Sequence, residues 1–350
     1  MKIWQKYLFR KLFFTFFFIT IALFSIYTTI DLSIHGVRFL TLGPEATLLD
    51  LFLYYLRQFA MHLDLFLPLS FLLSLYKVLF ALNTHLELIA LQMAGLSKKK
   101  LLLPFFFFAT ILSTICYLNH EYFAGEATAA AAAFKSSHTK KIKIARTLHL
   151  QTLLFDDQSE LIFQSFDPEK KEFFDAYWIS DKDLWHMKTL SIAKQPPTAY
   201  FADHLVRENK LLVKQESFVE KEFPTLPLDE TTTPKVFIPF ESRPLSTLFL
   251  ESSVPSIEAP SVKTHLHYKL ALPLFPLLIL LSASPFALSF SRHKRVFLII
   301  SLSLFAFLVY LTLFDSLLIL GENSVLPPLL AMWFCPTIVT LFSLRRFAKI

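Results

Sequence analysis

Long apolar runs stand on both sides of a more polar middle region of the chain. An α-helix needs about 20 mainly apolar residues to cross the hydrocarbon core of a bilayer. Six runs meet this requirement, at residues 12–32, 63–82, 101–122, 268–290, 296–318 and 327–344. The pattern therefore predicts a membrane protein with six transmembrane α-helices, three before the middle region and three after it.

The middle region, residues 135–263, has a different pattern. Its apolar runs are short and partly alternating, as in LHLQTLLF, FFDAYWIS and KLLVKQESFVE, and groups of Asp, Asn, Lys and Pro residues separate them. This spacing is typical of antiparallel β-structure. We therefore expect an inserted all-β, jelly-roll-like domain, and the prolines between residues 224 and 260 predict an extended linker after it. A β-domain without any ligand fits the same pattern.

Basic residues indicate the orientation of the helices. Thirteen of the 17 Lys and Arg residues outside residues 134–263 lie in the terminal segments or around residues 98–100 and 291–295. Segments that stay in the cytoplasm carry such an excess, so both termini are predicted to be cytoplasmic and the β-domain to lie outside. The predicted domains are residues 1–134 with helices 1–3 and a cytoplasmic helix at 84–96, residues 135–263 with the β-domain and linker, and residues 264–350 with helices 4–6.

The composition, 54% hydrophobic with a mean hydropathy of +0.50, is too apolar for one soluble core of 350 residues. A pI near 9.1 is compatible with nucleic-acid binding, but the basic residues lie at helix ends, where membrane topology explains them. We therefore expect no nucleic-acid partner.

Cys116 and Cys335 both lie in apolar runs, so no disulfide framework is predicted.

Motifs of enzymes and of cofactor binding are missing from the sequence. The five glycines, at positions 36, 43, 95, 125 and 321, do not form the loop that holds ATP phosphates, and neither HExxH nor GxSxG occurs. His149, His186 and His204 lack the spacing of metal ligands. The sequence therefore predicts no catalytic residue, no metal and no cofactor on this chain.

Residues 84–96, THLELIALQMAGL, separate the second and third apolar runs. The apolar side chains of this segment have the helical spacing i, i+3, i+4 and i+7, at Leu86, Ile89, Ala90 and Met93. This spacing predicts an amphipathic helix of two turns, which Gly95 is suited to end. A helix this short is marginal alone in water, so its apolar face needs a partner.

Glu87 has two possible roles in this segment. Thr84 and Glu87 have the spacing of a capping box, in which the carboxylate only completes the hydrogen bonds of the helix start. An acidic residue on a short cytoplasmic helix also suits docking to a soluble protein. The residues alone leave both roles open.

Polar residues near the outer ends of the apolar runs are candidate functional residues. His35 and Arg38 follow the first run, and Asp315 lies near the end of the fifth. Ionisable residues in membrane spans are functional candidates by default, although side chains at helix ends also simply reach towards the interface. Arg57 and Asp64 are seven residues apart, which places them on one face of a single helix.

Five segments resemble the lipopolysaccharide-export permeases of the LptF/LptG (YjgP/YjgQ) family. The most specific is ELIALQMAGLS, which resembles the coupling helix of these permeases. The segments are MKIWQKYLFRK at residues 1–11, FLPLS at 66–70, ELIALQMAGLS at 87–97, KLALP at 269–273 and VLPPLLAMWFCP at 325–336. The order of three helices, a β-domain and three helices is also similar to that of the family.

The resemblance implies a permease subunit of an ATP-driven transporter in the inner membrane, with its β-domain in the periplasm. Such a subunit extracts lipopolysaccharide and passes it to a periplasmic bridge protein that has a similar β-domain. The implied partners are a paralogous permease subunit and a cytoplasmic ATPase dimer, which binds the ATP. Another possibility is a membrane-anchored assembly or sensor protein whose β-domain binds a periplasmic protein without transport.

The resemblance also assigns two groups of residues on this chain. The implied lipid-contacting residues are Arg38, His35 and Asp315. The implied ATPase-coupling residues are Glu87, Leu86, Ala90, Met93 and Gly95.

Overall fold

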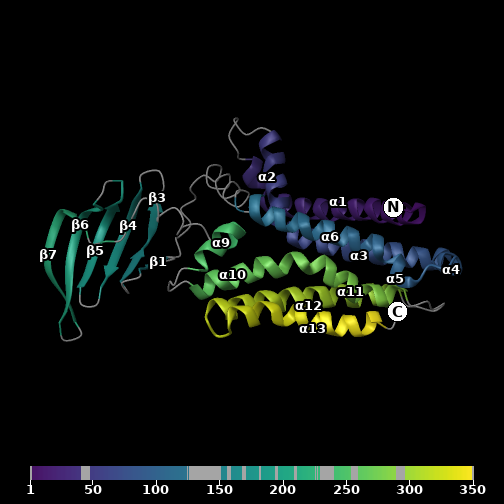
Figure 1. The fold of residues 1–350 in the computed structure, drawn as a ribbon. Coiled ribbons are helices and arrows are strands. Elements are labelled where there is room, and N and C mark those ends of the chain that lie inside the picture. The colour runs from purple at the N-terminus through teal and green to yellow at the C-terminus, as the bar shows by residue number, and fades with distance from the viewer. Residues whose placement is uncertain are drawn as a thin grey trace. The chain divides into compact units, whose positions relative to one another are not determined.

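The computed structural model describes residues 2–40, 48–123, 125, 151–155, 159–167, 171–180, 183–193, 196–208, 211–224, 226, 228, 240–253, 259–288 and 296–348. The chain divides into two compact units (Figure 1). The helical unit comprises Met1–Lys140, Phe240–Val254 and Ala259–Ile350, and the β unit comprises Lys141–Pro239 and Pro255–Glu258.

The helical unit is a bundle built from both halves of the chain. Its helices are α1 (Ile3–Leu40), α2 (Leu48–Met61), α3 (Leu63–Thr84), α4 (Glu87–Met93), α5 (Lys98–Leu101), α6 (Leu103–Leu118), α9 (Leu245–Glu251), α10 (Ala259–Ala271), α11 (Phe275–Leu288), α12 (Val296–Glu322) and α13 (Pro328–Ala348). A π-helical turn, Asn119–Phe123, extends α6, and 3-10 turns at Phe240–Ser242 and Leu272–Leu274 precede α9 and join α10 to α11.

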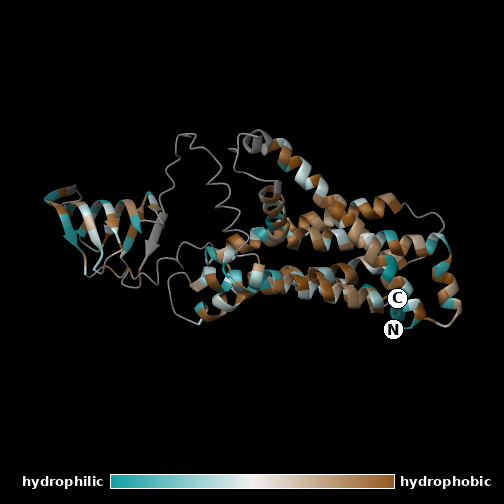
Figure 2. Cartoon of the chain, turned by 90° about the horizontal axis from the view of Figure 1, so that it is seen from above, coloured by the Kyte–Doolittle hydropathy of each residue, from teal (hydrophilic) through white to brown (hydrophobic). Residues whose placement is uncertain are grey.

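Six helical segments of this unit are long and apolar enough to cross a membrane. They are α1, α3, α6 with its π-helical turn, α10 with α11, α12 and α13. The predicted fold class of six transmembrane helices with an inserted β-domain is confirmed. Figure 2 shows these helices apolar along most of their length, whereas the strands of the β unit carry a mixture of polar and apolar residues.

Two boundaries differ from those predicted. The fourth span begins at Ala259 instead of residue 268, because Val262 and Leu266 in its first turns pack against Leu248 of α9. The extended linker predicted between residues 224 and 260 is wrong for the helical residues Phe240–Ser242 and Leu245–Glu251. Pro244 does not disrupt α9, because it stands immediately before the first helical residue, where proline is tolerated.

The two halves of the bundle share one hydrophobic core. Leu8 and Leu12 of α1 lie in it with Phe71 and Leu75 of α3 and Ala287 of α11. Among the six spans, α3 is the most buried, whereas α1 and α12 present most of their side chains outward. Outward apolar faces of this kind contact lipid or the helices of another subunit.

Gly321 allows α12 to approach α10 closely. A Cβ atom on Gly321 would lie 2.6 Å from Cγ2 of Thr264 and 3.3 Å from Cβ of Ala331. Small residues at helix contacts permit this spacing in membrane proteins.

We expect Gly321→Val to lower the thermal stability of the purified protein in detergent, because overpacking costs about 1–3 kcal/mol. Thr312→Val, at an exposed position of the same helix, is the matched control and should leave the melting temperature unchanged. Equal melting temperatures for the two variants would show that α10 and α12 tolerate a wider separation.

The β unit contains one antiparallel sheet among its described residues. Its strands are β1 (Gln151–Leu154), β2 (Glu160–Phe163), β3 (Ser165–Asp167), β4 (Glu172–Ile179), β5 (Asp183–Ser191), β6 (Thr198–Glu208) and β7 (Leu211–Glu222). Their order is β1-β2-β4-β5-β6-β7, and β3 pairs with β4. These strands form a meander, and none of them makes a Greek-key crossover.

One face of this sheet is buried. Neighbouring strands align Ala176 with Met187 and Met187 with Ala202, and all three side chains are fully buried. Phe223, which follows β7, packs onto the same cluster together with Leu226. The alternation of polar and apolar residues in the sequence therefore corresponds to one apolar and one polar face.

Candidate functional site

The candidate site is the end of the bundle at which α4, the start of α1 and the end of α13 lie together (Figure 1). Leu86 turns the chain sharply between α3 and α4 with a φ of +59°. The left-handed region is unfavourable for a residue with a branched side chain. The side chain of Leu86 is nevertheless 57% exposed. Strained backbone that displays an apolar side chain is a reason to look for function.

The two faces of α4 differ in burial. Leu88 is only 2% exposed, and Leu91 packs beside it against the bundle core. The four apolar residues with the predicted spacing form the opposite, exposed face, which we call the α4 outer face: Leu86, Ile89, Ala90 and Met93. Met93 is 84% exposed. The helix therefore buries one apolar face inside the chain and leaves a second one available to a partner.

The C-terminal end of α4 has the geometry predicted for Gly95. Gly95 has a φ of +84°, and its N–H donates to the carbonyl of Gln92. The N–H of Leu96 donates to the carbonyl of Leu91. These two bonds make a Schellman motif, which fixes where the helix stops. Ser97 then caps α5 by accepting a bond from the N–H of Lys100.

Glu87 connects α4 to α1. Nζ of Lys11 lies 3.1 Å from Oε1 of Glu87, and the Tyr7 hydroxyl donates to Oε2 at 2.9 Å. The capping box, one of the two roles that the spacing left open, does not form, because Thr84 is the last residue of α3 and its hydroxyl donates to the carbonyl of Phe80. The residue before α4 is Leu86, which has no side-chain cap.

The charge of Glu87 is stabilised by this contact. Partial burial acts to raise the pKa of the carboxyl, but the hydrogen bonds from Tyr7 and Lys11 outweigh it and hold the pKa below its ordinary value of 4.5. A depressed pKa means that the contact contributes its full stability at neutral pH and loses it only as the pH falls through that lowered value. The connection between α1 and α4 is therefore intact under physiological conditions.

The predicted lipid-contacting residues lie elsewhere. His35 and Arg38 belong to the last turns of α1, and their side chains fall outside the described residues. Asp315 is exposed on α12, where the hydroxyl of Tyr268 on α10 lies 3.5 Å from its Oδ1. None of the three is brought to the α4 end of the bundle.

The opposite end of the bundle holds buried polar contacts. Asp64 at the start of α3 lies 3.1 Å from Nε2 of His120, in the π-helical turn after α6. It does not share a helix with Arg57 as the spacing suggested, because α2 ends at Met61 and α3 begins at Leu63. The signal in the sequence was that Asp64 and His120 are ionisable residues at the same end of antiparallel spans.

Lys269, the first residue of the KLALP segment, is buried, and no role was predicted for its side chain. It is only 2% exposed, and its ammonium group donates to the carbonyl of Arg243 at 2.5 Å. Arg243 in turn pairs with Glu251 of α9 at 2.9 Å. These contacts attach the α9 segment to the fourth span. The signal was the position of Lys269 inside an apolar run, where a cation requires partners.

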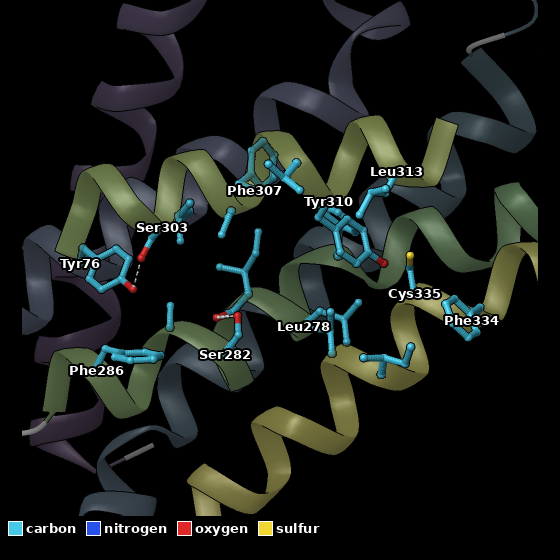
Figure 3. Close-up of a pocket in the computed structure, with 18 residues that line it drawn as sticks. Tyr76, Leu278, Ser282, Phe286, Ser303, Phe307, Tyr310, Leu313, Phe334 and Cys335 are labelled. Atoms are coloured by element: carbon cyan, nitrogen blue, oxygen red, sulfur yellow. Dashed lines mark hydrogen bonds between the residues drawn. The ribbon is translucent and has the colours of Figure 1, made fainter. Parts of the chain in front are cut away.

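An apolar cavity of about 490 Å³ lies between α3, α11, α12 and α13 (Figure 3). Phe286, Leu278 and Phe334 line it, and the side chains in the close-up converge on it from several helices. One of its few polar contacts joins the hydroxyl groups of Tyr76 and Ser303 at 2.7 Å. A cavity of this size and character is typical of a site for an apolar ligand.

The comparisons with known proteins agree with these features. A family model described as "Lipopolysaccharide export system permease LptF/LptG" matches residues 6–349. No curated protein matches the chain.

Proposed function

The chain belongs to the LptF/LptG family of lipopolysaccharide export permeases, and from this premise we propose that it is one subunit of an ATP-driven transporter. In this proposal the subunit helps to extract lipopolysaccharide from the inner membrane and pass it to a periplasmic bridge protein. It pairs with a paralogous permease subunit. ATP is bound and hydrolysed by a separate cytoplasmic ATPase dimer.

The observation that carries the proposal is the α4 outer face. The family model matches nearly the whole chain. In addition, α4 is a short helix that packs against the spans and still exposes an apolar surface. A helix that places apolar residues outward at intervals of three and four is suited to a groove on another protein. We propose that this groove belongs to the ATPase and that Gly95 contributes by fixing the end of the helix.

The β unit is proposed to receive the lipid and to contact the bridge protein. Among the described strands, β7 pairs only with β6 and so presents an open edge. Val219 on this strand is exposed. An open edge can pair with a strand of a similar β-domain in another protein.

Arg38, His35 and Asp315 are proposed as contacts for the lipid head group. An arginine near the end of α1 is suited to a phosphate, because its guanidinium group forms paired charge-assisted bonds. This role follows from the family resemblance and from the positions of the residues in α1 and α12.

Cysteine labelling tests the orientation that the proposal requires. After Cys116 and Cys335 are replaced by alanine, we expect Val219→Cys to react with a membrane-impermeant thiol reagent in intact spheroplasts. Ala94→Cys, at the end of α4, should react only after the membrane is permeabilised. Both positions are exposed in the structure, so accessibility of the side chain itself does not differ. The reverse labelling pattern would contradict a cytoplasmic α4.

The function is tested by purifying the tagged full-length chain in a mild detergent. We expect a second permease subunit, an ATPase and lipopolysaccharide to accompany it, and ATP to drive release of the lipid from proteoliposomes to the bridge protein. Recovery of a periplasmic protein without an ATPase would favour an assembly or sensor role instead.

A further inference from the structure

The cavity between α3, α11, α12 and α13 continues towards the α4 end of the bundle. A second cavity of about 210 Å³ adjoins it between α11 and α13. Both are lined by Ser282, Phe286, Ile338 and Val339, so they form one cleft, which we call the α11–α13 cleft. Figure 3 shows Ser282 and Phe286 towards one end of the larger cavity and Phe334 and Cys335 towards the other.

Among the described residues that line this cleft, Arg346 alone carries a guanidinium group, and it lies at the outer end. Arg346 lines the smaller cavity, and its Cζ lies 4.7 Å from the ring centroid of Phe286 and 5.0 Å from that of Phe342. A guanidinium group is attracted to the faces of aromatic rings at such distances. The rest of the lining is apolar, apart from Ser282 and Ser343.

The length of the cleft corresponds to one membrane leaflet. Phe334 at its deep end and Arg346 at its outer end are twelve residues apart on α13, which is about 18 Å along a helix. One leaflet contributes about 15 Å of hydrocarbon to a bilayer. An acyl chain that begins at Arg346 would therefore reach the deep end of the cleft near the middle of the bilayer.

We propose that the α11–α13 cleft binds an anionic glycerophospholipid of the leaflet at the α4 end. An acyl chain occupies the apolar cavity, and the phosphate group contacts Arg346. The charge complementarity selects an anionic lipid over a zwitterionic one, because basic residues between helices at the membrane surface attract anionic head groups. This site is separate from the proposed contacts of lipopolysaccharide, and only its assignment to the cytoplasmic leaflet rests on the proposed function.

Arg345 provides a matched control for Arg346. It is the neighbouring arginine on the same exposed turn of α13, but it does not line either cavity. A basic residue that only favours the cytoplasmic side of the membrane would be interchangeable with its neighbour. A residue that contacts a bound lipid would not be interchangeable with its neighbour, because only one of the two side chains reaches the lipid.

The experiment reconstitutes the purified full-length complex in nanodiscs of phosphatidylethanolamine and phosphatidylglycerol. Lipids that remain bound after release are counted by native mass spectrometry. We expect bound phosphatidylglycerol to fall about fivefold in Arg346→Gln, the change that corresponds to about 1 kcal/mol, and to stay unchanged in Arg345→Gln. Equal loss in both variants, or no loss in either, would overturn the proposal.

A second measurement uses phosphatidylglycerol with a photoreactive group at the end of one acyl chain. We expect crosslinks to peptides that contain Leu313 and Phe334, and we expect Ser282→Phe to abolish them by filling the cleft where the two cavities meet. Crosslinks to a helix of another protein would show that a protein occupies the cleft and would overturn the proposal. Both measurements detect lipid binding in nanodiscs, where both leaflets are accessible and no transport is needed. A failure of the same protein to release lipopolysaccharide would therefore contradict only the proposed function.

Discussion

Glu87→Gln is expected to reduce lipopolysaccharide release about tenfold in proteoliposomes that contain the complete transporter. The amide cannot keep the charge-assisted bonds to Lys11 and Tyr7, which join α4 to α1. Such bonds contribute about 1.5–3 kcal/mol when buried, and we take about 1–2 kcal/mol because both charged side chains are partly exposed. About 1.4 kcal/mol corresponds to a factor of ten. Glu87→Ala should reduce lipopolysaccharide release by at least the same factor.

A charge exchange identifies the partner of Glu87. If the acid acts through α1, the double variant Glu87→Lys with Lys11→Glu should recover most of the release that either single variant loses. Lys6→Glu, five residues earlier on α1, is the control for a charge change at an exposed position. A defective double variant would place the partner of Glu87 on the ATPase, and normal release by Glu87→Gln would exclude a role for the charge.

Met93→Glu is expected to abolish co-purification of the ATPase with this chain. Burial of a methionine side chain in a protein interface contributes about 1.5–3 kcal/mol, and a carboxylate in the same place would be desolvated without a partner. The predicted loss of bound ATPase is therefore greater than tenfold. It is measured by affinity purification in mild detergent and quantitation of both subunits.

Two controls separate docking from folding. Met93→Leu preserves the volume and apolar character of the side chain and should retain the ATPase. Leu250→Glu introduces the same charge at a residue of α9 that is 70% exposed at the opposite end of the bundle, and it should also retain the ATPase. Full recovery of the ATPase with Met93→Glu would exclude the α4 outer face as the docking surface.

The local features of this protein were predictable from the sequence. Six apolar runs, the alternating middle region and the end of α4 at Gly95 all depend on residues close together in the chain. Helix length, strand alternation and the left-handed glycine each have a short-range physical cause. These predictions were therefore confirmed, with boundary errors where packing extended a helix beyond its apolar run.

The contacts between distant residues were not predictable. The sequence spacing of Thr84 and Glu87 suggested a capping box, whereas the carboxylate binds Lys11 and Tyr7 on another helix. Asp64 was assigned to the same helix face as Arg57, and the break at His62 placed it beside His120. Each error has the same cause: spacing along the chain determines neighbours only within an unbroken helix.

The shared core of the bundle has a consequence for the biosynthesis of this protein. The most buried span, α3, ends at Thr84, but α11, which packs against it, begins only at Phe275. At about 5–20 residues per second, the ribosome needs roughly 10–40 s to make the intervening chain. During that time the first three spans lack the part of their core that α11 supplies. Until α11 has been made, the inner face of α3 therefore lacks its partner from the second half of the chain, and we expect a version of the protein that ends before Phe275 to be degraded faster than the full-length chain.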